Sequence, residues 1–205
     1  MQNRISKTLK ATIINLIVAF LVILIIIGGV RLAFGQKIDE AVTLLNYFTL
    51  DLSDKKMTEI VYDQQYGLKS YPEYGAKYAD IEIEKIDANL PVYFGSTLEI
   101  LKDGVGHDSG SYFPGEGGSI IYMGHNSKNV FRRFSELQVG DMIKVTTTYG
   151  EFNYEIYDLK LIDEDQADML PIQRDEEILM VYTCYPFNNI GYTTQRYVVY
   201  SKLVK

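Results

Sequence analysis

The chain has 205 residues, and its 20 basic and 27 acidic side chains give a formal net charge of −7, with one cysteine, two histidines and no tryptophan. This length corresponds to one ordinary domain. A single cysteine excludes an intramolecular disulfide and the zinc sites built from two or four cysteines. The negative charge argues against a general nucleic-acid-binding protein, which needs a basic surface to displace counterions from phosphates. We therefore expect no nucleic-acid partner.

The first apolar segment, residues 11–34, is long enough to cross a membrane. Its first twenty residues are apolar except for Thr12 and Asn15, and twenty helical residues at about 1.5 Å each span about 30 Å, the thickness of a bilayer's hydrocarbon core. A cleaved signal peptide is the alternative, but its apolar core usually has about 7–15 residues and ends in a small-x-small site. The end of this run, Gly-Gly-Val-Arg-Leu-Ala-Phe, contains no clear Ala-x-Ala. We therefore favour an uncleaved transmembrane anchor.

The charges beside the apolar segment predict its orientation. Residues 1–10 contain Arg4, Lys7 and Lys10 and no acidic residue. The positive-inside rule places such a basic flank in the cytoplasm. We expect a single-pass protein of the cell membrane whose N-terminus is cytoplasmic and whose remaining domain is extracellular.

Residues 35–78 are polar and lack a sustained period. Five apolar residues would nevertheless form a stripe along a helix: Ile38, Val42, Leu45, Phe48 and Leu52. We expect a helical stalk and a linker here. The tyrosines of this stretch are expected to pack onto the domain that follows: Tyr62, Tyr66, Tyr71, Tyr74 and Tyr78.

From residue 79 to the C-terminus the pattern is that of a β domain. Residues 80–86 alternate and place three isoleucines on one face of a strand. Further strands are predicted at 90–94, 118–124, 141–147, 152–162, 178–184 and 192–203, separated by turns rich in Gly, Asp and Asn. The one helical insertion is predicted at 128–137. Short strands at this spacing favour a closed or nearly closed antiparallel barrel.

The single cysteine, Cys184, ends an apolar strand-like run and is followed by Tyr185-Pro186, where proline stops the hydrogen-bonding ladder. The end of a strand can hold a nucleophile rigidly while the adjoining loop leaves room for a substrate. The alternative is an inert buried thiol, because free cysteine is among the most buried residue types.

His125 also ends a strand, directly after Gly124. If the two strand ends are neighbours, His125 can accept the proton of the Cys184 thiol and later return it to a leaving amine. Arg196, twelve residues after the cysteine, lies in the last strand and can stabilise a thiolate or an oxyanion. Taken alone, each could be a solvated surface residue. His107, in a glycine-rich turn, is expected to be structural or at the rim of the site.

The combination of an N-terminal anchor, a β domain, Gly-His, Thr-Cys and a final-strand Arg resembles the sortases, the cysteine transpeptidases that attach proteins to the cell wall of Gram-positive bacteria. The resemblance covers about residues 79–205. Its most specific motifs are Ile81-Glu-Ile-Glu-Lys-Ile86, Leu90-Pro-Val-Tyr93, Gly104-Val-Gly-His107, Phe113-Pro-Gly-Glu-Gly-Gly118, Met123-Gly-His125 and Val139-Gly-Asp141. The anchor, the compact connection at 163–177 and the Gly-Val-Gly-His motif are most like class D, with class A as the neighbour.

This resemblance implies a closed eight-stranded β-barrel with short helices, and it assigns His125, Cys184 and Arg196 as the catalytic residues. Thr183 and Tyr185, which flank the nucleophile, are implied to bind substrate. The family's usual Thr-Leu-x-Thr-Cys reads Met-Val-Tyr-Thr-Cys here, and Glu84 stands where proline is common. These departures leave the nucleophile in place and bear on substrate preference.

The implied reaction is attack of the Cys184 thiolate on a Leu-Pro-x-Thr-Gly-like (LPXTG-like) sorting signal after its Thr, followed by transfer to a peptidoglycan precursor amine. The implied partners are therefore secreted proteins with such a C-terminal signal, the wall amine and the membrane lipid. No metal or organic cofactor is required. Class A enzymes often bind calcium, and four acids could do so here, although a solvated acidic loop is favoured: Asp163, Glu164, Asp165 and Asp168.

Two other functions remain open from the residues alone. One is a cysteine endopeptidase in which water resolves the same thioester. Papain-like and cell-wall peptidase folds are disfavoured because their cysteine precedes the histidine, whereas His125 precedes Cys184 here. The other is a membrane-tethered module that binds a sorting-type peptide without catalysis.

Overall fold

The computed structural model describes residues 13–34, 56–63, 67–167, 170–173, 175–187, 189 and 192–204. The chain divides into two units, of which the first contains the N-terminal helix and the second the β domain. The expected cytoplasmic residues 1–10 and most of the expected stalk, residues 35–55, lie outside the described residues, as do Tyr66 and Asp168.

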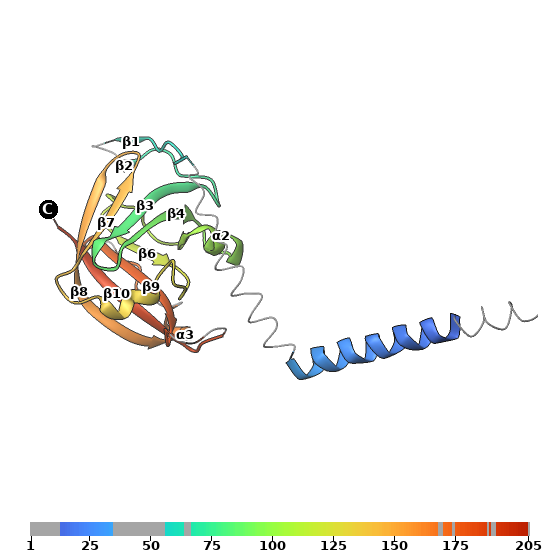
Figure 1. Cartoon of the computed structure of the whole chain (residues 1–205). Coiled ribbons are helices and arrows are strands. Elements are labelled where there is room, and N and C mark those ends of the chain that lie inside the picture. The colour runs from blue at the N-terminus through green and yellow to red at the C-terminus, as the bar shows by residue number, and fades with distance from the viewer. Residues whose placement is uncertain are drawn as a thin grey trace, which may run out of the picture. The chain divides into compact units, whose positions relative to one another are not determined.

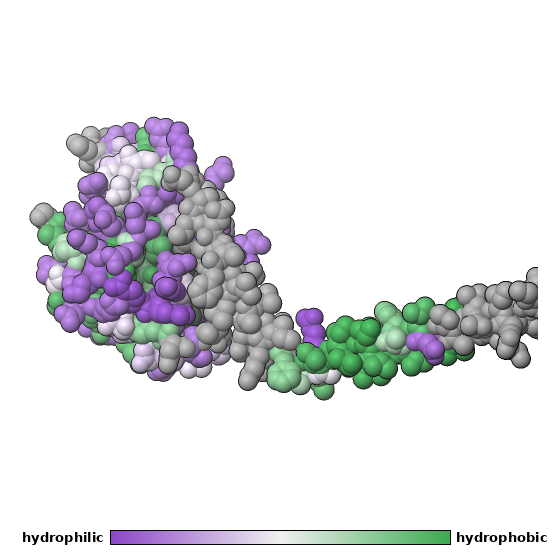
Figure 2. All heavy atoms as spheres, viewed as in Figure 1, coloured by the Kyte–Doolittle hydropathy of each residue, from purple (hydrophilic) through white to green (hydrophobic). Residues whose placement is uncertain are grey.

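The N-terminal helix spans Ile13–Phe34, and its 22 residues have a mean hydropathy of 3.1 in their most apolar window. None of that window is buried inside the protein, and Figure 2 shows the hydrophobic (green) side chains covering this helix. Its length and composition suffice to cross a membrane. The prediction of one N-terminal apolar helix is confirmed, and the helix is consistent with a single-pass anchor.

The second unit contains a closed barrel of eight strands in the order β10-β8-β7-β3-β4-β5-β6-β9 (Figure 1). The strands are β3 (Lys77–Ile83), β4 (Ala88–Phe94), β5 (Val105–His107), β6 (Ser119–Met123), β7 (Met142–Thr147), β8 (Glu151–Asp163), β9 (Ile178–Tyr185) and β10 (Gln195–Leu203). A separate hairpin pairs β1 (Tyr62–Asp63) with β2 (Gly67–Leu68). The short helices are η1 (Glu84–Ile86), α2 (Leu98–Asp103), η2 (Arg132–Glu136) and α3 (Glu164–Ala167). The mainly β fold and its eight-stranded closed barrel are confirmed.

Some sequence predictions of the elements were wrong. The barrel is mixed rather than antiparallel, because β4 pairs with β5 and β6 pairs with β9 in parallel. The alternating run ends at Ile83, where η1 begins, so Ile86 is not on that strand. Residues 128–137 hold a 3₁₀ helix. The helical stripe predicted at 38–52 lies outside the described residues, and the described residues 56–63 and 67–76 before the barrel contain the β1–β2 hairpin. β5 and α2 were not predicted.

The side chains of β6, β9 and β10 point alternately to the two faces of the sheet. Inside the barrel lie Ile120, Tyr122, Leu179, Val181 and Val199, which belong to the main core. The outer face carries a second apolar cluster of Ile121, Met123, Leu170, Met180 and Val198. Leu170 comes from the connection between β8 and β9, residues 164–177, so this connection packs on the outer face.

The tyrosines before the barrel pack onto it as predicted. The Tyr62 ring stacks on Tyr149 with centroids 5.3 Å apart, and the Tyr71 ring lies 5.3 Å from Phe113. Tyr78 begins the barrel itself and is completely buried. Aromatic packing therefore accounts for the described tyrosines Tyr62, Tyr71 and Tyr78 of this stretch.

Candidate active site

Cys184 and Arg196 are direct neighbours across the antiparallel pair of β9 and β10. Opposite residues in such a pair project to the same face. Cys184 is two and four residues beyond Tyr182 and Met180, so its side chain lies on the outer face that carries the second apolar cluster. The strand register thus places the side chains of Cys184 and Arg196 on the same outer face of the barrel.

The parallel pairing of β6 with β9 brings the end of β6, just before His125, beside the end of β9, which carries Cys184. Its last aligned residues are Met123 and Tyr182, and two residues further on stand His125 and Cys184. His125 therefore follows the end of β6 directly beside the stretch of β9 that leads to Cys184. The predicted neighbourhood of the two strand ends is therefore borne out by the register.

Hydrogen bonds tie these two strand ends together. The buried Thr183 hydroxyl donates to the Gly124 carbonyl at 2.8 Å, and the Gly124 amide donates to the Tyr182 carbonyl at 3.1 Å. Beyond the cysteine, the Asn126 side-chain amide donates to the Pro186 carbonyl at 2.9 Å. The residues on both sides of His125 are thus held to β9.

Gly124 permits a close approach of the backbone to the helix that follows. A Cβ atom at this position would lie 2.5 Å from the ring of Phe131 and 3.0 Å from Cγ1 of Val130. Phe131 is completely buried, so it cannot move aside into solvent. A side chain at residue 124 would therefore displace His125 or disturb this packing.

Burial lowers the pKa of His125 below its usual value of 6.5. Removal of water disfavours the charged imidazolium. The resting imidazole is therefore biased towards its neutral form at neutral pH, and a neutral imidazole can accept a proton from a thiol. This is the protonation state that a general base needs.

The Arg196 side chain is largely shielded, with 13% of its surface exposed. Its Nη1 donates to the Thr193 carbonyl at 2.9 Å, to the Thr193 hydroxyl at 3.1 Å and to the Gln195 carbonyl at 3.0 Å. Its Nη2 is paired with the carboxylate of Glu164 on α3. The sequence predicted that Arg196 lies in the last strand, but it did not predict the ion pair with Glu164. Glu164 was considered only as one of several acidic residues in a loop.

The two residues that flank the nucleophile face away from it. Thr183 is buried beneath the site and links the strand ends, and the alternation of β9 turns Tyr185 to the inner side. The Tyr185 ring lies against Phe187 and Tyr197, with centroids 5.3 and 6.4 Å away. Their predicted contact with substrate stays a prediction, and the structure gives the Thr183 side chain a supporting position.

His107 is not in a turn at the rim, as one reading of the sequence had it, but at the end of β5 and completely buried. Its ring is hydrogen-bonded to Tyr78, Ser111 and Tyr112. The expectation that it is structural is confirmed. Arg133 binds Glu136 and Asp87 at the surface.

Within the part of the chain that the structure describes, no group of three or more His, Cys, Asp or Glu side chains is arranged to hold a metal ion. Of the acids named for calcium, Glu164 is engaged by Arg196 and by the Tyr192 hydroxyl. The expectation that no cofactor is required stays a prediction.

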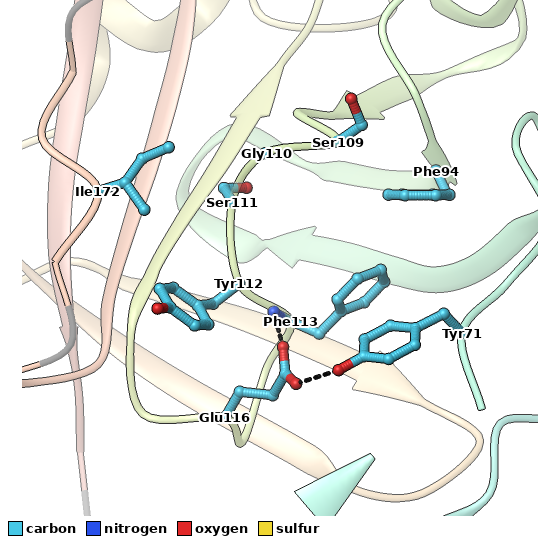
Figure 3. A pocket seen from close by; sticks show the side chains of 9 residues that line it. All are labelled: Tyr71, Phe94, Ser109, Gly110, Ser111, Tyr112, Phe113, Glu116 and Ile172. Carbon is cyan, nitrogen blue, oxygen red and sulfur yellow. Dashed lines mark hydrogen bonds between the residues drawn. The ribbon is translucent and has the colours of Figure 1, made fainter. Parts of the chain in front are cut away.

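A pocket of about 480 Å³ lies beside the connection between β5 and β6. Figure 3 shows Glu116 at its edge, where the carboxylate accepts hydrogen bonds from the Tyr71 hydroxyl and the Phe113 amide, both at 2.8 Å. Ile172 lines the opposite side. None of Cys184, His125 and Arg196 lines this pocket, so it is distinct from the site described above.

Comparison with known proteins agrees with this geometry. Residues 81–204 match the Sortase domain family. The chain belongs to the sortase family. It is 42% identical to Sortase D of Bacillus subtilis (strain 168) over 133 residues, which are 65% of this chain and 67% of that protein. The sortases are cysteine-type transpeptidases that act at the cell surface.

Solved sortase structures share the barrel. A Clostridium perfringens Sortase D5 transpeptidase superposes with a TM-score of 0.60 and 35% identity over 66% of this chain and 83% of that chain. Sortase A from Corynebacterium diphtheriae gives a TM-score of 0.57 and 26% identity over 63% of this chain and 61% of that chain. The resemblance to class D sortases predicted from the sequence is confirmed by these relatives.

Proposed function

We propose that this sortase cleaves an LPXTG-like sorting signal after its Thr and transfers the protein to an amine of a cell-wall precursor. The observation that supports the proposal is the register of three strands, which pairs Cys184 with Arg196 and brings the end of β6, two residues before His125, beside β9. A thiol, a base and a cationic hydrogen-bond donor on one face are the groups that acyl transfer through a thioester needs.

In the first half of the reaction, the Cys184 thiol gives its proton to neutral His125, and the sulfur attacks the carbonyl carbon of the Thr residue. Arg196 donates hydrogen bonds to the oxyanion that forms. The C–N bond then breaks, and the protonated His125 gives its proton to the leaving amine. A thioester between Cys184 and the N-terminal part of the substrate remains.

In the second half, an amine attacks this thioester while His125 accepts its proton. The new amide forms as the Cys184 thiolate leaves, and the returned proton restores the resting pair. If water attacks instead, the product is a free acid and the enzyme is an endopeptidase. Competition between the amine and water therefore distinguishes the two enzymatic functions.

The connection between β8 and β9 covers the outer face next to the site. Its Leu170 packs into the buried cluster of Ile121, Met123, Met180 and Val198, which leads along the strands towards Cys184. Because this connection borders the strand that carries the nucleophile, it is proposed to help read the signal.

The experiment uses the full chain in detergent micelles with a panel of LPXTG-like peptides, with and without a small amine, and intact mass as the readout. We expect a mass gain equal to the N-terminal peptide fragment, absent in Cys184→Ala, that amine discharges faster than water. Faster discharge by water would establish the endopeptidase. Binding of the peptides without any adduct, equal in the parent chain and in Cys184→Ala, would establish a binding module instead.

We also propose that residues 11–34 anchor the enzyme with residues 1–10 in the cytoplasm and residues 79–205 outside the cell. The basic residues before the helix support this orientation. Because Cys184 is the only cysteine, a maleimide that cannot cross membranes tests it directly. Intact cells should be labelled as fully as lysed cells, and labelling only after lysis would reverse the orientation.

A further inference from the structure

The two loops at the active-site end of β10 meet at one acidic side chain. Glu164 begins α3, just after β8, and one of its oxygens accepts a hydrogen bond from Arg196 Nη2. Its other oxygen accepts from the Tyr192 hydroxyl at 2.5 Å. Its backbone amide donates to the Thr194 carbonyl at 2.8 Å. Two contacts of the carboxylate and one of the backbone amide therefore fix Glu164 against the connection that leads into β10.

The Glu164 carboxylate completes the environment of the guanidinium. The carbonyls of Thr193 and Gln195 and the hydroxyl of Thr193 all engage Nη1 of Arg196. Glu164 alone among the described contacts holds Nη2. An arginine side chain has many rotamers, and a planar fork held at both terminal nitrogens loses most of them.

The ion pair is more shielded than a typical surface pair. The exposed fractions are 13% for the Arg196 side chain and 35% for the Glu164 side chain. The negative charge of Glu164 is also evident at its second partner, since this hydrogen bond and charge raise the pKa of Tyr192. A shielded carboxylate at this place influences both the geometry and the local potential of the guanidinium.

We propose that Glu164 is a positioning residue for the sortase reaction: it fixes the Arg196 guanidinium beside Cys184 and offsets part of its positive charge. The inference rests on the proposed function and extends it to a residue outside the Cys, His and Arg set. Glu164 acts through Arg196 and does not itself contact the reacting atoms.

Two substitutions separate the geometric effect from the charge effect. In Glu164→Gln, the amide oxygen still accepts from Arg196, so the guanidinium stays in place while one negative charge is lost. We expect kcat within about 3-fold of the parent value. In Glu164→Ala the Nη2 partner is lost, and we expect kcat to fall about 10-fold with little change in KM, a part of the 10²–10³-fold cost of losing an oxyanion donor.

The charge effect is measured on the thiol without any substrate. The chain has one cysteine, so the rate of alkylation by iodoacetamide reports Cys184 alone. Loss of the Glu164 charge leaves the guanidinium field uncompensated and favours the thiolate. We therefore expect the alkylation profile of Glu164→Gln to shift to lower pH relative to the parent enzyme.

Asp165→Asn is the matched control, because it removes the same charge from the next residue of the same helix, where the side chain is exposed. It should leave kcat and the alkylation profile unchanged. Parental kcat in Glu164→Ala, or equal effects of the Glu164 and Asp165 substitutions, would overturn the proposal. A change confined to KM would also overturn it and assign Glu164 to peptide binding. If the parent chain forms no acyl-enzyme, the proposed function fails, while the alkylation profiles still decide the role of Glu164.

Discussion

A buried histidine should make the barrel sensitive to acid. His107 is completely buried, and its burial lowers its pKa from 6.5 to about 3. Its Nδ1 lies 2.9 Å from the Tyr78 hydroxyl, and its Nε2 lies 2.9 Å from the Ser111 hydroxyl and 3.1 Å from the Tyr112 carbonyl. Because a carbonyl only accepts, the network assigns a neutral ring with its proton on Nε2.

The sign of the effect follows from the two pKa values. Below pH 6.5 the unfolded chain binds a proton at His107 that the folded barrel does not, so the free energy of unfolding falls as the pH falls. The slope is about 1.4 kcal/mol per pH unit. Between pH 6.5 and 4.5 this residue should therefore cost about 2 to 3 kcal/mol, and the loss should level off near pH 3, where the folded state also takes up the proton.

Two measurements check this. The chain has two histidines, so an NMR titration of the full chain in micelles gives two ring signals, which His125→Gln assigns. The His107 signal should not titrate above about pH 4. In urea unfolding, His107→Gln should be the less stable protein at pH 7, and this deficit should shrink by about 2 to 3 kcal/mol at pH 4.5. A His107 midpoint above pH 5, or a deficit independent of pH, would refute the reasoning.

Three further predictions concern the supports of the site and the barrel. Thr183→Val removes the buried hydrogen bond to the Gly124 carbonyl, so the free energy of unfolding in urea should fall by about 1–3 kcal/mol and kcat should fall as well. An unchanged kcat would show that this hydrogen bond does not contribute to catalysis. Gly124→Ala places a Cβ against the Phe131 ring and should lower stability by about 1–3 kcal/mol, measured in the same assay; parental stability would show that the ring can move. Tyr154→Phe removes the 2.7 Å hydrogen bond to the buried Glu177 carboxylate and should lower the free energy of unfolding by about 1–3 kcal/mol at pH 7. An unchanged free energy of unfolding would mean that backbone donors alone are enough to stabilise this carboxylate.

The residues of the candidate site could be named from the sequence because their signals are local. Each of Cys184, His125 and Arg196 stands at a recognisable point of a strand pattern, and the alternation of β10 correctly separated Arg196 from Tyr197. The strands with clear alternation were found within a few residues of their observed bounds. Residue types and the two-residue alternation of strands can both be recognised in a single sequence.

Other features depend on pairings that a single sequence does not display. β5 has three residues, of which the middle one is Gly106, and Gly104 precedes it, so it has no visible period. The burial of His107 comes largely from aromatic residues distant in the chain, such as Tyr78, Phe94 and Tyr122. The parallel pairing of β6 with β9 likewise spans the whole β7 and β8 segment. These features follow from tertiary contacts rather than from propensity.

The parallel pairing of β6 with β9 nevertheless determines the geometry of the candidate site. Thr183 and Gly124 are 59 residues apart in sequence, and the aligned pairs from Ser119 with Ile178 to Met123 with Tyr182 keep the same offset without a bulge. A slip of one residue would turn the side chain of Cys184 into the barrel, because successive side chains of a strand point to opposite faces. The bond from the buried Thr183 hydroxyl, at the last position before the nucleophile, opposes that slip where it would do the most harm. The Thr183 side chain, which faces away from Cys184, thus holds the register on which the candidate site depends.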